Sequence, residues 1–204
     1  MSSSASVENV TPSEFDPGHF WEHHKGKILL YGGILLVALL ISAIYQVNEH
    51  RKLAGSRAAL ASASTAEEYA AVIEKFGGTM SAGNAHLLLA ASQREEKKYD
   101  EAIATLESFL KAYPDHPLAG GALLSIGEIQ EVAGRTDEAL ATYKETVEKY
   151  PDTYGAPAAM MAEATFFKNS GKTDDARRVF EDLVSQFPDS YMSMQAEAEL
   201  RFLK

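Results

Sequence analysis

The chain contains the stretches KAYPDHP (Lys111–Pro117), EKYPDTY (Glu148–Tyr154) and SQFPDSY (Ser185–Tyr191), which share an aromatic residue followed by Pro and Asp. Each stretch follows a run of residues with helical hydrophobic spacing, and the three prolines are 37 residues apart. Proline ends a helix because it has no backbone N–H group to donate and its ring clashes with the preceding turn. The three triplets therefore mark the ends of repeating units.

Other positions keep the same 37-residue period. Two positions of each unit hold a small residue, and a bulky residue follows the second one by four places. The residues on which we expect the repeat packing to depend are Ala90, Gly127 and Ala164, then Ala102, Ala139 and Ala176, and the terminal Pro114, Pro151 and Pro188. Small residues let two helices of one unit approach closely. Because one helix pair cannot bury its apolar face alone, the sequence predicts an all-α solenoid of stacked antiparallel pairs.

The second complete unit illustrates the predicted helix pair. Its first helix spans about Leu118–Ala133, and Gly134 supplies the left-handed residue that ends it. Thr136 is the expected N-cap of the second helix. Pro151 and Asp152 end that helix, and we expect the Asp side chain of each triplet to accept hydrogen bonds from nearby backbone N–H groups. A calcium site made from the three aspartates is disfavoured, because equivalent turns of stacked units lie far apart.

The period also extends towards the N-terminus. Tyr69, Ile73 and Phe76 fall on the positions of later units, so an eroded unit precedes the three complete ones. Its first helix is expected to continue from the apolar segment before it. We therefore predict a degenerate unit at 46–82, complete units at 83–119, 120–156 and 157–191, and a closing helix at 192–204.

The succession of a small residue, Ala, a bulky residue and Pro at these spacings resembles the tetratricopeptide repeat (TPR), as in Gly127, Ala139, Tyr143 and Pro151. The resemblance implies that the first helices line a groove that binds partner proteins. The expected groove residues are Leu87, Ala91, Leu124, Glu128, Met161, Thr165 and Lys168. The Lys and Asn positions by which chaperone-binding members hold a carboxylate are not kept, so an apolar or basic segment is the expected ligand. Alternatively, these side chains belong partly to the core.

The segment ILLYGGILLVALLISAIY, residues 28–45, contains no charged residue. As a helix it would span about 27 Å, close to the hydrocarbon thickness of a bilayer. No A-x-A-like cleavage site follows it, because the bulky Ile41 occupies the critical position. We therefore predict one uncleaved transmembrane helix at 28–45, preceded by a mostly disordered cytoplasmic tail at 1–27. A short tail before the helix and a long acidic part after it favour a periplasmic location for the repeats.

The composition argues against several kinds of function. The net charge of −10, from 29 acidic and 19 basic residues, disfavours nucleic-acid binding. The sequence has no cysteine, and it has no GxGxxG, P-loop or HExxH motif. We expect no enzyme activity, catalytic residue, cofactor or metal. His19 and His23, which His24 follows, would share one helix face and could hold a metal, but an aromatic and histidine cluster beside a membrane explains them as well.

The order of tail, aromatic and lysine boundary, single anchor and repeats resembles the membrane-anchored ancillary subunits of the bacterial SecYEG translocon. Much of the likeness lies in FWEHHKGKILLYGGILLVALLISAIYQVNEHRKLAGSRAAL, residues 20–60. It implies a single-pass inner-membrane protein with a periplasmic TPR domain, whose partners are translocon components, periplasmic chaperones or emerging chains. An adaptor for cell-division or outer-membrane assembly machinery would carry similar repeats. An enzyme built into a helical solenoid is a third alternative, and the sequence leaves the oligomeric state open.

Overall fold

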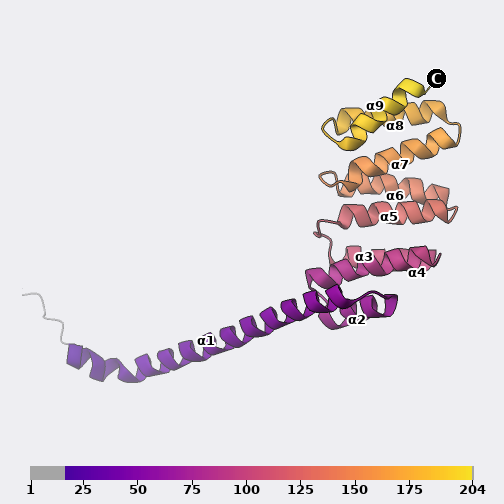
Figure 1. Cartoon of the computed structure of the whole chain (residues 1–204). Helices are drawn as coiled ribbons and strands as arrows, with labels where there is room; N and C mark the ends of the chain where they lie inside the picture. Colours follow the sequence, from indigo (N-terminus) through magenta and orange to yellow (C-terminus); the bar gives the residue numbers. More distant parts are fainter. Residues whose placement is uncertain (1–16, 204) are drawn as a thin grey trace, which may run out of the picture. The chain divides into compact units, whose positions relative to one another are not determined.

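The structure, a computed structural model, describes residues 17–203 apart from the side chain of His19. Within this range it contains nine α-helices and no strand, which confirms the predicted all-α fold (Figure 1). The helices are α1 (Pro17–Ser62), α2 (Ala66–Phe76), α3 (Met80–Glu95), α4 (Tyr99–Ala112), α5 (Ala119–Val132), α6 (Thr136–Lys149), α7 (Gly155–Asn169), α8 (Thr173–Gln186) and α9 (Tyr191–Phe202).

The chain divides into two compact units, Met1–Arg51 and Lys52–Lys204. The first unit contains the apolar part of α1, whose side chains are exposed throughout residues 28–45. The segment Phe20–Ser62 is the one helix of the described residues that is long and apolar enough to cross a membrane, a test that a signal sequence also passes. Residues 17–27 of the predicted tail are helical. The rest of that predicted tail lies outside the described residues.

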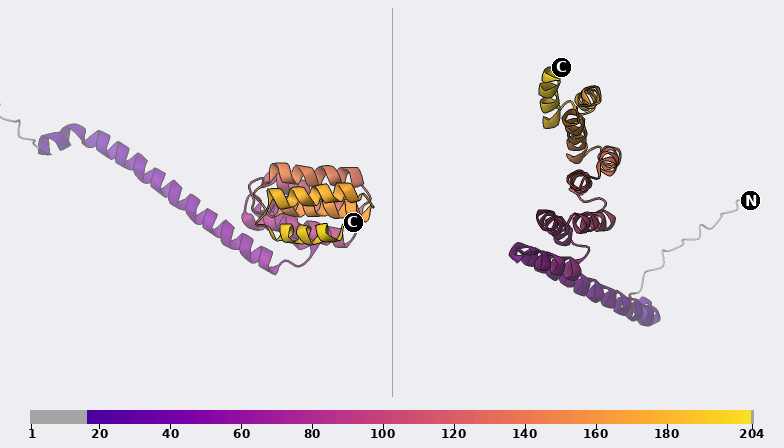
Figure 2. Two further views of the ribbon diagram at one scale, coloured as in Figure 1. Left: turned by 90° about the horizontal axis from the view of Figure 1, so that it is seen from above. Right: turned by 90° about the vertical axis from the view of Figure 1, so that its right-hand side faces the viewer.

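The second unit, Lys52–Lys204, is the repeat domain. Its helices pack as the pairs α3/α4, α5/α6 and α7/α8, and each pair contacts the next, with α9 packed on α8. The right-hand view of Figure 2 shows these helices nearly end-on, with one pair stacked upon the next. The end of α1 belongs to the same domain. Ser56 is buried, its hydroxyl donates to the Leu53 carbonyl (2.9 Å), and its Oγ lies within hydrogen-bond distance of Oγ of Ser81 on α3 (3.2 Å).

The turn inside each pair has the same backbone conformation. A left-handed residue follows the first helix, with φ of +62° at Lys97, +79° at Gly134 and +74° at Gly171. In the middle pair, the Arg135 N–H then donates to the Gln130 carbonyl (2.8 Å), which closes the end of α5. The expectation for Thr136 was wrong, because α6 begins at Thr136 and its N-cap is Arg135, without a side-chain bond. This turn is so short that the cap position falls one residue earlier.

The aromatic-Pro-Asp triplets form the turns between pairs. Each aromatic residue is the C-cap of a second helix, and the residue three places later donates its N–H to the aromatic carbonyl, as from His116 to Tyr113 (3.1 Å) and from Thr153 to Tyr150 (3.1 Å). The triplet aspartates, by contrast, accept no hydrogen bond from the described residues. This corrects the expectation of Asp side-chain bonds. The backbone closes the turn by itself and leaves each carboxylate exposed.

The small residues of the repeat lie at the contacts within each pair. Ala90, Ala102, Gly127, Ala139, Ala164 and Ala176 are all buried. Pro114, Pro151 and Pro188 are exposed directly after the C-caps. The buried bulky residue of α6, Tyr143, lies over Gly127 of α5. These small residues let the two helices of a pair approach closely.

Candidate functional site

The predicted groove residues lie on three first helices, but they differ in exposure. Ala91, Thr165 and Lys168 are exposed, Leu87, Glu128 and Met161 are half-buried, and Leu124 is buried. Leu124 is only 8% exposed and packs in a core cluster with Tyr143. Its side chain is therefore part of the packing between repeats, as the alternative core interpretation of these positions proposed.

A pocket of about 540 Å³ lies between α3 and α5. Leu87, Ala90 and Ala91 line it from α3, Leu106 from α4, and Leu118, Gly121, Ala122, Ser125 and Ile129 from α5. The structure thus brings Leu87 and Ala91 together with α5 residues that the sequence analysis did not select. The other predicted groove residues are not among those lining this pocket. Its walls are mostly apolar and small, which suits an apolar group.

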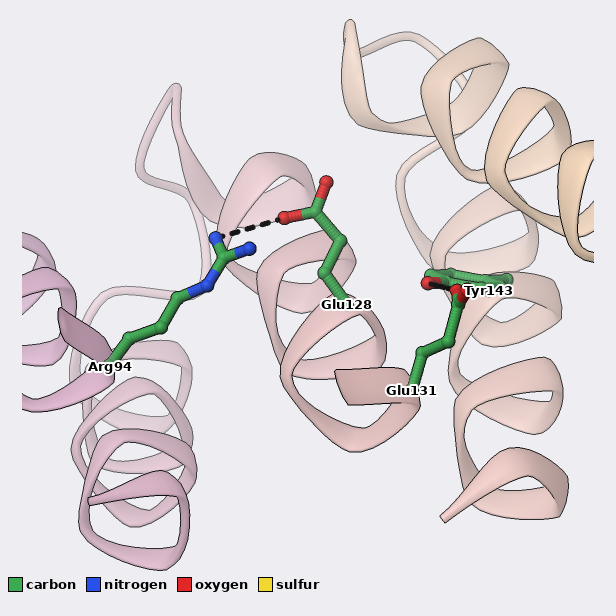
Figure 3. A network of polar contacts seen from close by, with 4 residues as sticks. All are labelled: Arg94, Glu128, Glu131 and Tyr143. Carbon is green, nitrogen blue, oxygen red and sulfur yellow. Dashed lines mark hydrogen bonds and ion pairs between the residues drawn. The ribbon is translucent and has the colours of Figure 1, made fainter. Parts of the chain in front are cut away.

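Charged side chains stand at one end of this pocket. Arg94 and Glu95 of α3 both line it. Figure 3 shows Arg94 reaching towards Glu128 of α5, where its Nη1 lies 3.3 Å from Oε2. Glu95 has no ion-pair partner within 4 Å among residues 17–203. The end of the pocket therefore carries one paired cation and one uncompensated carboxylate.

Two further acidic or phenolic groups are buried, and packing accounts for them. The Tyr143 hydroxyl donates to Oε2 of Glu131 (2.8 Å; Figure 3), and burial raises the pKa of Tyr143. Burial also raises the pKa of Glu163 on α7, whose Oε1 lies 3.9 Å from Nζ of Lys144 on α6. Each of these contacts joins two adjacent helices.

Hydrogen bonds between Gln and Thr were not foreseen from the sequence. They join the first and second helices of two pairs, from Thr105 Oγ1 to Gln93 Oε1 (2.8 Å) and from Thr142 Oγ1 to Gln130 Oε1 (2.7 Å). In the third pair, Phe167 and Val179 occupy the equivalent places and pack together in an apolar cluster. The signal was present in the sequence, because both members of the polar pair change to apolar residues together.

The histidines near the apolar segment were considered as metal ligands. The His24 ring stacks on Phe20, with 4.5 Å between centroids, and its Nδ1 lies 3.1 Å from the Phe20 carbonyl oxygen. The side chain of His19 lies outside the described residues, so the structure does not test the pairing of His19 with His23. Among the side chains that are described, no group of three His, Cys, Asp or Glu could hold a metal ion.

Antiparallel helix pairs that stack through small residues, with a pocket between successive first helices, define an α-helical repeat solenoid. Two family models with the description "Tetratricopeptide repeat" match this chain. One matches residues 46–117 and 87–153, and the other matches residues 158–190. Since the first model alone matches more than half of the chain, the protein belongs to the tetratricopeptide-repeat family. Members of this family are generally non-enzymatic scaffolds that bind other proteins.

Solved structures show the same fold. A tetratricopeptide repeat protein from Parabacteroides merdae matches 76% of this chain with a TM-score of 0.51 and 18% identity, and the chain spans 59% of its length. A putative kinesin light chain from Podosopora anserina with nearly identical TPR-like repeats matches 68% of this chain with a TM-score of 0.50 and 16% identity, over 75% of its own length. No curated protein matches the chain.

Proposed function

We propose that this protein is a membrane-anchored TPR scaffold of the bacterial cell envelope, ancillary to the Sec translocon and the periplasmic chaperone network. Its repeats bind proteins, and it catalyses no reaction. The observation that carries the proposal is the double role of α1. This single helix contains the exposed apolar segment and ends with residues that pack in the first repeat, as Ser56 does against Ser81.

The proposed topology follows from the sequence around the anchor. Residues 1–27 lie in the cytoplasm, residues 28–45 span the inner membrane, and the repeats lie in the periplasm. Protease added to spheroplasts should then degrade the repeat domain, while the same treatment of intact cells should leave it whole. Full protection of the repeat domain in spheroplasts would contradict this topology. Release of a mature protein that lacks the apolar segment would show that the segment is a cleaved signal.

The proposed partners are translocon components, periplasmic chaperones or emerging chains. The sequence resemblance to the SecYEG ancillary subunits supports this choice, and the α3 and α5 surface offers a place for a partner. Crosslinking in intact membranes, followed by identification of the captured proteins, tests it. Recovery of Sec components is the expected result. Recovery of cell-division or outer-membrane assembly proteins without any Sec component would favour the alternative adaptor function.

A further inference from the structure

The junction between α5 and α7 is closed by glycines. A Cβ atom added to Gly155 would lie 2.4 Å from both the carbonyl carbon and the carbonyl oxygen of Gly120. The two helix backbones are therefore in direct contact there. The hydroxyl of Thr153, in the turn before α7, lies against the same glycine, because a Cβ at Gly120 would meet it at 2.1 Å.

The junction between α3 and α5 has bulkier residues at the equivalent places, 37 positions earlier. His116 replaces Thr153, and Leu118 replaces Gly155. The His116 ring is buried over Gly83, where an added Cβ would lie 3.3 Å from its Cδ2. Leu118 remains 51% exposed and forms part of the pocket wall. The imidazole of His116 therefore takes the place that the Thr153 hydroxyl has in the next junction, and the pocket of about 540 Å³ lies between α3 and α5 beside it.

We propose that this pocket binds a bulky apolar side chain of a partner protein segment that carries Lys or Arg beside it. The inference rests on the proposed scaffold function and names the chemistry of the partner. The volume lies within the range of pockets that bind ligands, roughly 300–1,000 Å³, and the walls from Leu87, Leu106 and Ala122 are apolar.

Charge selects the residues that flank the apolar side chain. Glu128 already pairs with Arg94, so Glu95 is the carboxylate left to attract a cation at this end of the pocket. The whole repeat domain, residues 52–204, carries 24 acidic and 16 basic residues. An acidic flank on the partner would meet repulsion at the site and from the domain as a whole, whereas a basic flank is attracted by both.

Gly121 offers a way to fill the pocket without disturbing the core. It lines the pocket from α5, and a Cβ added to it would meet no atom within 4 Å. Replacement of a helical glycine also favours the folded helix. Gly121→Leu should therefore occupy the pocket and leave the melting temperature unchanged or raised. Ala141→Leu, at an exposed position of α6, adds an apolar side chain elsewhere and serves as the matched control.

The experiment uses the full chain in lipid nanodiscs and short peptides with one central benzoylphenylalanine as the photoreactive apolar residue. One peptide has Lys on both sides of that residue, and a second has Glu on both sides. A third peptide has no central benzoylphenylalanine and carries this residue at its end instead, after a run of Ser. We expect the Lys-flanked peptide to label α3 and α5. Labelling should fall by roughly tenfold or more with the Glu-flanked peptide and with the Gly121→Leu protein, and should persist with Ala141→Leu.

Equal labelling by the Lys- and Glu-flanked peptides, unchanged labelling of the Gly121→Leu protein, or labelling confined to other helices would overturn the inference. Absence of labelling by any peptide would overturn it as well. The scaffold function has a separate readout, the proteins captured in intact membranes. If Gly121→Leu captures the same partners as the unaltered chain, the pocket inference fails while the scaffold function stands. Failure to capture any partner with the unaltered chain would contradict the scaffold function itself.

Discussion

The ring of Tyr143 on α6 covers the backbone of Gly127 on α5 so closely that an added Cβ would lie 2.5 Å from its Cε1. In the first pair, the equivalent residues are Ala90 and Leu106. Ala90 is larger than Gly127, and Leu106 is smaller than Tyr143. The sizes of the two side chains are thus balanced in these first two pairs. This balance sets how closely the two helices of a pair approach.

Gly127→Ala should destabilise the repeat domain, because the new methyl group overlaps a buried aromatic ring. We expect a loss of about 1–3 kcal/mol in the free energy of unfolding, measured by circular dichroism on the full chain in detergent. The double variant Gly127→Ala with Tyr143→Leu copies the first pair and should recover most of the loss. Gly121→Ala, whose Cβ meets open space, is the control and should not destabilise the protein. Equal melting temperatures for Gly127→Ala and the unaltered chain would refute the proposed close contact.

Thr142→Val removes the donor that satisfies Oε1 of Gln130 in a buried place. An unsatisfied buried polar group costs about 1–3 kcal/mol, so we expect a lower melting temperature. The double variant Gln130→Phe with Thr142→Val copies the apolar pair of the third repeat, and it should be more stable than Thr142→Val alone. If the single variant is as stable as the unaltered chain, the hydrogen bond contributes nothing to the packing of α5 on α6.

The protonation of His116 should affect stability. Its Nδ1 accepts a hydrogen bond from the Leu118 N–H (3.1 Å), which places the proton of the neutral ring on Nε2, a buried atom without a partner in the described chain. Burial lowers the pKa of His116. An unfolded histidine takes up its proton near pH 6.5, before the folded one does, so the free energy of unfolding should fall as the pH drops below about 6.5.

The variant His116→Thr removes the titrating group. Its threonine is the residue found at the equivalent position of the next turn between pairs, Thr153. Thermal unfolding of both proteins between about pH 7.5 and 5.5 measures the effect. The unaltered chain should lose more stability over this range than the variant. Equal losses in the two proteins would show that His116 does not contribute to the pH dependence.

The repeated features of the fold were accessible from the sequence, and the features of single junctions were not. The period indicated the paired helices, and Gly134 marked a left-handed turn, because glycine tolerates positive φ. The period did not show that Leu124 would be buried, because both the first-helix face and the core select apolar residues there.

The pocket between α3 and α5 was missed for a related reason. It lies where His116 and Leu118 differ from their equivalents in the next repeat, Thr153 and Gly155. A pattern built from the residues that the repeats share does not include such differences. The N-cap of α6 differs from the prediction because Thr136 is a good cap by residue type, while the three-residue turn assigns that position to Arg135. Residue type alone does not fix the register of so short a turn.

We propose above all that the first-helix surface of the repeat domain binds partner proteins. The most direct measurement places a photoreactive amino acid at Ala91 on α3, beside the pocket, or at the exposed Ala141 on α6, and irradiates intact membranes. We predict that the probe at position 91 captures partner proteins, Sec components among them, and that the probe at position 141 captures far less. Equal capture from both positions, or capture from position 141 alone, would contradict the account.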